Sequence, residues 1–230
     1  MMKHARELIW SKVDRCIFLE DDYIPAVSYF RFCAELLEKY KDDERVAMIS
    51  ALNHFVDWDC GDNSYFFAKT GAIAAWATWK RVWDNFDFTI KDYNDDYVKK
   101  VIKSSFNHKY AANARMKNWQ SIYERGQKGE KIRYWGPQFG FLKYRTTALS
   151  IVPSHTLSSN VGVGPKATFS GMGAEFMKKS MRPWFFQKTR PMEFPLKHPV
   201  TILPDCEYDK KYYDITYPNP IVGFITKTFY

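Results

Sequence analysis

The stretch Cys16-Ile17-Phe18-Leu19-Glu20-Asp21-Asp22 decides how this 230-residue chain is interpreted. Its first four residues form a continuous apolar run, which is typical of a short strand buried on both faces of a parallel sheet. Three consecutive carboxylates then end the strand. Because ligands of α/β sheets bind at the carboxyl ends of strands, we expect the three acids to lie where the chemistry takes place.

The residues that follow continue the pattern of an α/β fold. Pro25 suits the first turn of a helix, and apolar residues recur at three- and four-residue spacing from Val27 to Tyr40. After a turn at residues 41–44, the apolar run at 46–49 indicates a second buried strand. This β-α-β order predicts a parallel sheet covered by helices.

The remainder of the chain is less regular. We expect a short strand at 65–68, a helix at 77–86, a helix-compatible stretch at 93–125, a strand at 148–152 and a glycine-rich loop at 160–165. From residue 166 onward, frequent proline, lysine and aromatic residues predict an irregular segment. The expected organisation is therefore a domain at 1–165 and an extension at 166–230 packed on it.

The composition is that of a globular chain with a basic surface. Hydrophobic residues make up 46% of it, and the net charge of +8 favours anionic partners such as nucleotide diphosphates or phospholipid head groups. No arginine-rich run or zinc-knuckle spacing gives specific support for nucleic-acid binding. Scattered cysteines indicate reduced thiols, and the sequence has neither a signal peptide nor an apolar stretch of about 18 residues. We expect a cytoplasmic protein, free or peripheral at the inner membrane.

Several segments, in order along the chain, resemble one family. The Ile17–Asp22 segment followed by Pro25 is similar to the strand–E-D-D–helix segment of GT-A glycosyltransferases, which include N-acetylglucosaminyltransferases and bacterial polysaccharide-cluster transferases. Residues 76–83 (W-A-T-W-K-R-V-W) are close to a signature of the bacterial members. Further similar segments are residues 48–53, 149–153, 159–164 and 195–199. The resemblance implies a GT-A-like α/β fold, a mixed sheet with helices on both faces.

The resemblance also implies roles for individual residues. Asp22 would bind Mn²⁺ or Mg²⁺, which neutralises charge on a leaving diphosphate. Asp21 would face the nucleotide ribose, Glu20 would approach the donor sugar, and Asn53 would add to the donor site. The implied acceptor-binding residues are Trp76, Trp135 and Gln138. On chemistry alone, the acids also fit a loop stabilised by a helix dipole, and Trp79 and Trp83 fit a helix core.

Three features depart from the family pattern. The position of the usual general base is Gly136, which cannot accept a proton, so the catalytic base is unknown. A histidine usual after the glycine loop is replaced by Phe169, and the nearby His155 is more typical of a structural residue. Only 19 residues precede Glu20, so we expect an N-terminally truncated sheet that lacks its nucleotide-binding unit. A partner chain or self-association would complete its exposed edge.

Two functions remain open at this point. The first is metal-dependent transfer of a sugar from a nucleotide-diphosphate donor to a saccharide or lipid-linked acceptor in surface polysaccharide synthesis. The second is a non-catalytic, degenerate relative that binds a saccharide or a partner protein. A nucleic-acid-binding module is supported only by the charge and the aromatic content, and we expect no nucleic-acid partner.

Overall fold

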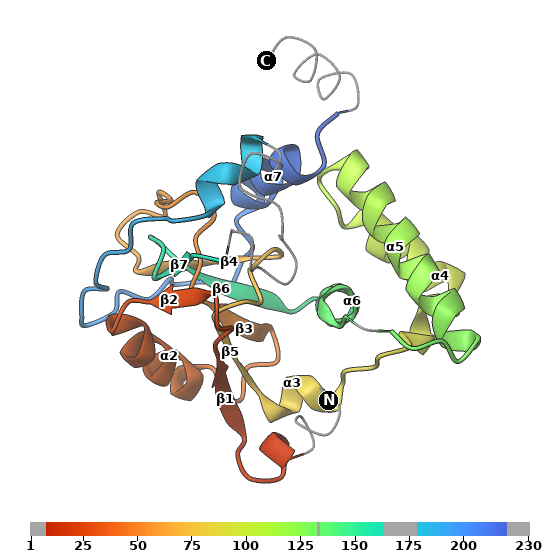
Figure 1. Ribbon diagram of the computed structural model, residues 1–230, viewed down its shortest axis with the longest axis horizontal. Coiled ribbons are helices and arrows are strands. Elements are labelled where there is room, and N and C mark those ends of the chain that lie inside the picture. The colour runs from red at the N-terminus through yellow and green to blue at the C-terminus, as the bar shows by residue number, and fades with distance from the viewer. Residues whose placement is uncertain (1–7, 133, 163–178, 220–230) are drawn as a thin grey trace. The chain divides into compact units, whose positions relative to one another are not determined.

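The computed structural model describes residues 8–132, 134–162 and 179–219 and has a mixed α/β fold (Figure 1). The chain divides into two compact units, and each unit combines separate parts of the sequence. Residues 1–85 and 148–205 form the first unit, and residues 86–147 and 206–230 form the second. This division cuts across the boundary expected at residue 165.

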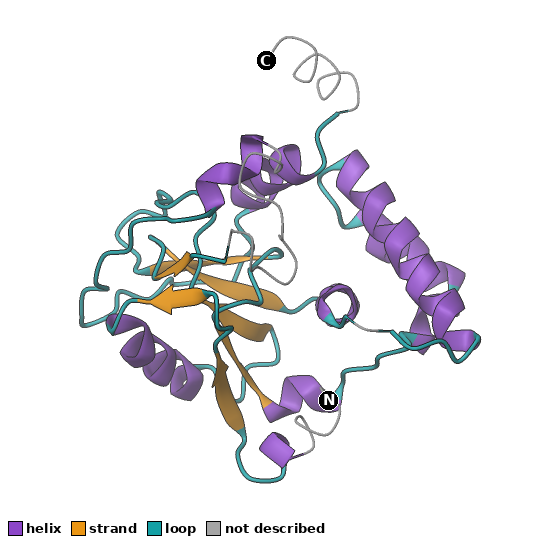
Figure 2. Cartoon of the chain, viewed as in Figure 1, coloured by secondary structure: helices purple, strands orange, loops and turns teal. Residues whose placement is uncertain are grey.

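A five-stranded mixed sheet forms the core of the first unit (Figure 2). Its strands in chain order are β1 (Arg15–Phe18), β3 (Val46–Ser50), β4 (Tyr65–Ala68), β5 (Trp76–Trp79) and β6 (Leu149–Pro153). In space the order is β1-β5-β3-β6-β4, with β3 and β6 parallel and the other pairings antiparallel. All strands except β1 are buried along their whole length, which explains their nearly continuous apolar sequences.

The predicted β-α-β unit is present, but β5 is inserted between its two strands. Because β5 pairs antiparallel with both β1 and β3, these two strands run in the same direction. Helix α2 (Ser28–Lys39) lies between them in the chain and packs on the sheet, where Trp79 Nε1 donates a 2.9 Å hydrogen bond to the Leu37 carbonyl. The prediction of a parallel strand buried on both faces was wrong for β1, which lies at the sheet edge and is partly exposed.

The helix predicted around Trp79 and Trp83 is a strand followed by a short helix. β5 ends at Trp79, and α3 (Lys80–Asp84) begins at the next residue. The two tryptophans therefore do not share a helix face, and Trp83 packs against Trp76 with ring centroids 6.1 Å apart. Arg81 holds the start of α3 in place by donating hydrogen bonds of 2.7–3.0 Å to three backbone carbonyls, those of Tyr40, Lys41 and Val46.

The second unit is helical in its described residues. It contains η1 (Lys91–Asn94), α4 (Asp96–Ser104), α5 (Lys109–Gln127), α6 (Gly136–Thr146) and α7 (Cys206–Thr216). Its core is a cluster of large apolar side chains, Ile90, Tyr93, Ile102, Trp119, Ile122 and Phe141. Val98 and Ile102 of α4 lie in or against this cluster, and so does Phe106, which follows the end of α4. The stretch expected to be helix-compatible from 93 to 125 is thus two helices, α4 and α5, separated by residues 105–108.

Helix α7 corrects the prediction that the chain is irregular beyond residue 166. Its Tyr208 and Tyr213 are buried, and the Tyr213 hydroxyl lies 2.5 Å from the hydroxyl of Tyr144 on α6. At the surface, His108 Nε2 lies 3.1 Å from a carboxylate oxygen of Asp214. These contacts attach a late segment of the chain to the helices of residues 86–147.

Before α7, the chain returns to the first unit. The short helix η3 (Lys179–Trp184) is followed by residues 185–205 without further helix. Trp58 Nε1 donates a 2.7 Å hydrogen bond to the Asp205 carboxylate near the end of this segment. Among the helices described, none has both the length and the apolar character needed to cross a bilayer.

Candidate functional site

A two-stranded antiparallel ribbon holds the acidic turn of residues 20–22. Its strands are β2 (Tyr23–Pro25) and β7 (Ser158–Asn160), and Tyr23 lies opposite Asn160. The pairing continues one residue further, because the Val161 amide donates a 2.8 Å hydrogen bond to the Asp22 carbonyl. Pro25 therefore ends a strand, whereas we expected it to begin a helix. The ribbon brings together the acidic turn and the start of the glycine-rich loop, two segments far apart in the sequence.

Side chains on one face of the ribbon fix the position of Gly162 at the start of the glycine-rich loop, whose residues 163–165 lie outside the described residues. Asn160 Nδ2 donates a 2.6 Å hydrogen bond to the Tyr23 hydroxyl, and Asn160 Oδ1 accepts one of 2.8 Å from the Gly162 amide. Burial raises the pKa of Tyr23 to about 12, so this phenol is neutral and can accept the bond. Asn160 thus ties the first glycine of the loop to the strand that follows the acidic turn.

Gly162 lies directly against the carboxylate of Asp22. A Cβ at this position would lie 2.5 Å from the Cβ of Asp22 and would overlap its carboxylate, so the close approach requires glycine. Asp22 Oδ1 is buried and accepts no hydrogen bond from the described residues. A buried carboxylate oxygen without a donor is unfavourable, and a bound cation is one way to compensate it.

The other two carboxylates of the turn are exposed. Although Glu20 is exposed as a residue, neighbouring protein atoms partly desolvate its carboxylate, and this effect, followed by the charges of Asp22 and Asp21, raises the pKa of Glu20. In the parts of the chain that the structure describes, no three acidic, histidine or cysteine side chains converge as a metal site. A metal ion at Asp22 would therefore take most of its ligands from a substrate and from water.

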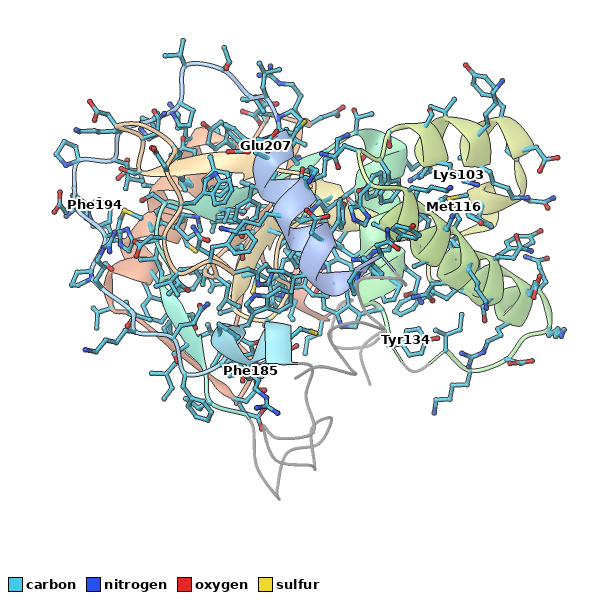
Figure 3. All side chains as sticks on the ribbon, turned by 90° about the horizontal axis from the view of Figure 1, so that it is seen from above. Lys103, Met116, Tyr134, Phe185, Phe194 and Glu207 are labelled. Atoms are coloured by element: carbon cyan, nitrogen blue, oxygen red, sulfur yellow. The ribbon has the colours of Figure 1, made fainter. Side chains whose placement is uncertain are left out.

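The opposite face of the ribbon carries one exposed apolar side chain, Ile24, which lies across from Ser159. Because side chains alternate along a strand, Ile24 points away from the Tyr23–Asn160 pair, and it is 60% exposed. Beyond β7, the Phe186 amide donates a 2.9 Å hydrogen bond to the Asn160 carbonyl, next to Phe185, which Figure 3 labels. Phe186 is also 60% exposed. Two exposed apolar side chains, Ile24 on the ribbon and Phe186 beside β7, are thus available to a ligand.

Asn53, which we expected to contact the donor, is fully buried. Its Nδ2 donates 3.0 Å hydrogen bonds to the carbonyls of Pro153 and Ser154, and its Oδ1 accepts one from the Phe55 amide. The side chain joins the segments that follow the parallel strands β3 and β6. The Asn53 side chain stabilises these segments and offers no exposed atom to a ligand.

None of the three expected acceptor-binding residues is exposed. Trp76 is 2% exposed and stacks on Phe18, with ring centroids 5.1 Å apart. Trp135 and Gln138 belong to the second unit, where Trp135 packs edge-on against Phe139. Gln138 is buried and donates hydrogen bonds of 3.0 and 3.4 Å to two backbone carbonyls, those of Tyr134 and Phe88.

The structure describes some of the positions at which the sequence departs from the GT-A pattern that it resembles. Gly136 is the first residue of α6 and has no side chain that could act as a base. His155 is 7% exposed and pairs across a β-bridge with Asp57, and burial lowers the pKa of its ring. The structural role expected of His155 stays a prediction. Phe169 lies outside the described residues.

A histidine that the sequence did not single out lies near the carboxyl end of β3. The ring of His54 packs against that of Trp184 in a tilted arrangement, with the ring centroids 4.6 Å apart. Burial lowers the pKa of His54 to about 4. Two residues later, Val56 has a φ of 68°, a strained conformation for a β-branched residue. The contact of His54 with Trp184 has no local sequence signal, because the two residues lie far apart in the sequence.

The sequence matches no protein-family model and no curated protein. The assignment of a function therefore depends on the residues described above and on the resemblance of the sequence segments.

Proposed function

We propose that this protein binds a nucleotide-diphosphate sugar through a divalent cation at Asp22 and transfers the sugar to an acceptor. The observation that carries the proposal is the buried Oδ1 of Asp22, which accepts no hydrogen bond from the described residues beside the Gly162 backbone. A Mn²⁺ or Mg²⁺ ion would bind there with oxygen ligands and would stabilise the charge that develops on the diphosphate.

The residues around Asp22 have separate tasks in this proposal. Asp22 supplies one oxygen to the cation, and Asn160, itself bonded to Tyr23, holds Gly162 against Asp22. Glu20, whose pKa is raised, approaches the donor sugar, and Asp21 faces the ribose. We assign no general base, because the family's position for it is Gly136.

The exposed side chains of Ile24 and Phe186 favour an acceptor with a lipid or another apolar group. Ile24 and Phe186 would contact that group while the acceptor's sugar hydroxyl approaches the donor. We place this activity in the synthesis of surface polysaccharides on the cytoplasmic side of a membrane.

Release of nucleoside diphosphate from a panel of nucleotide sugars tests this proposal. Reactions contain Mn²⁺, with or without simple and alkyl-tailed glycoside acceptors. We expect metal-dependent release that increases with the alkyl-tailed acceptors and is abolished in Asp22→Asn. The control variant Asp59→Asn changes an exposed acid elsewhere in the first unit and should be fully active. Release that is independent of metal, or equal in the Asp22 variant, would refute the proposal.

A second function, binding without catalysis, is favoured by Gly136 and by the burial of Asn53, Trp76 and Gln138. Such a protein would bind a saccharide or a partner protein and leave the donor intact. Saccharide binding without any turnover of the nucleotide-sugar panel would support this function over the first.

A further inference from the structure

Almost all of the net positive charge belongs to the second unit. Residues 86–147 and 206–230 contain 16 Lys and Arg against 9 Asp and Glu, a net charge of +7 out of the total of +8. The first unit, with 18 basic and 17 acidic side chains, has a net charge of +1. The charge is therefore a property of the helical unit and points to an anionic partner for it.

Helix α4 combines this charge with exposed apolar side chains. Its inner side contributes Ile102 and Val98 to the core. On the outer side, Tyr97 is 74% exposed and Val101 is 46% exposed, and their four-residue spacing places them on one face. Lys100, next to Val101 in the chain, is also exposed.

A second exposed lysine, Lys103, lies near the carboxyl end of the same helix (Figure 3). Neither Lys100 nor Lys103 forms a salt bridge within the described residues, whereas Lys99 pairs with Asp96 at 3.1 Å. The two lysines are therefore available to an external anion. Four other exposed lysines of this unit, Lys109, Lys117, Lys128 and Lys131, increase its attraction for a negatively charged surface.

We propose that the outer face of α4 docks this unit on the surface of an anionic lipid bilayer. Tyr97 and Val101 enter the interfacial layer, where an aromatic ring with a polar end is favoured. Lys100 and Lys103 contact the lipid phosphates. A lipid surface fits better than a nucleic acid, because an exposed aliphatic side chain beside the tyrosine has an apolar layer to enter.

Sedimentation of the full chain with lipid vesicles tests the proposal. Vesicles contain phosphatidylcholine alone or with phosphatidylglycerol. We expect binding only to the anionic vesicles, and weaker binding as salt is added. Each lysine at an anionic surface contributes about fivefold, so Lys100→Gln with Lys103→Gln should weaken binding roughly 25-fold. Tyr97→Ala with Val101→Ala should also weaken binding, but should leave its salt dependence unchanged.

A matched control removes the same charge elsewhere in the unit. Lys128→Gln with Lys131→Gln changes two exposed lysines beyond α5 and should weaken binding by less than the α4 pair. Equal losses in the two double variants would overturn the assignment to α4. Equal binding to neutral vesicles would overturn the electrostatic argument. Displacement of the protein from anionic vesicles by trace single-stranded oligonucleotide would identify a nucleic acid as the preferred partner and would also overturn the proposal.

Discussion

Replacing Gly162 with alanine tests the contact on which the candidate site is built. The new Cβ would lie 2.5 Å from Asp22 Cβ and 2.8 Å from its Cγ. These atoms are close to the backbone of the acidic turn, so rotation of a flexible side-chain end cannot relieve the overlap. The paired strands β2 and β7 would have to move apart, or the Asp22 carboxylate would have to turn away.

Overpacking of this kind costs about 1–3 kcal/mol of unfolding free energy. For a chain of this size, the melting temperature falls by about 2–4 °C per kcal/mol, which differential scanning fluorimetry resolves easily. Because Asp22 is displaced, metal-dependent nucleotide binding should be lost as well. The control is Gly140→Ala in α6, where the nearest atom would lie 4.0 Å away and alanine favours the helix by about 0.5–1 kcal/mol.

The two glycines should therefore change the melting temperature in opposite directions. If Gly162→Ala melts at or above the temperature of the unchanged protein and keeps its nucleotide binding, the close approach of the loop to Asp22 is wrong.

Three further predictions concern parts of the first unit. Arg81→Ala leaves three backbone carbonyls without their donor and should lower the unfolding free energy by about 3 kcal/mol in urea titrations; an unchanged midpoint would contradict this. Tyr23→Phe removes the hydrogen bond from Asn160 and should lower the unfolding free energy by about 1 kcal/mol. It should also weaken nucleotide binding, and unchanged binding would show that Gly162 does not need this bond to keep its position. Burial lowers the pKa of His54 from 6.5 to about 4, so its contribution to stability is complete above pH 6.5 and is lost as the pH falls towards 4. His54→Gln should remove this loss from parallel thermal melts, and an identical pH dependence in both proteins would argue against it.

The buried strands were largely predictable from the sequence. Apolar runs at 46–49, 65–68 and 148–152 correspond to β3, β4 and β6, and the helix expected between Val27 and Tyr40 is α2. Such runs carry a strong signal because strands buried on both faces need apolar side chains at nearly every position. The apolar stripe expected on that helix was only partly right, because Val27 and Phe30 are exposed. The buried side chains of α2 are Tyr29, Phe32, Cys33, Leu36 and Leu37.

The neighbours of each strand were not predictable in the same way. A four-residue apolar run such as 16–19 does not reveal whether the strand is central or at an edge, or parallel or antiparallel. Trp79 and Trp83 have helical spacing, yet Trp79 is the last residue of strand β5. This strand lies between β1 and β3 in the sheet. That insertion depends on pairings between segments far apart in the chain.

The contacts within the candidate site could not be predicted from the sequence either. The sequence places carboxylates after a strand and a glycine loop late in the chain, but the register of Tyr23 with Asn160 sets their contact. Asn53 and Gln138 are residue types that often bind ligands, although the amide nitrogen of each donates to backbone carbonyls here. Polar side chains that stabilise loops cannot be distinguished by residue type from those that contact a ligand.

Calorimetric titration of a nucleoside diphosphate, with and without Mn²⁺, tests the central claim about Asp22 most directly. We predict binding to the unchanged protein that requires the metal ion, and no binding to Asp22→Asn under the same conditions. Binding that is equally strong without the metal ion, or that persists in Asp22→Asn, would contradict the account.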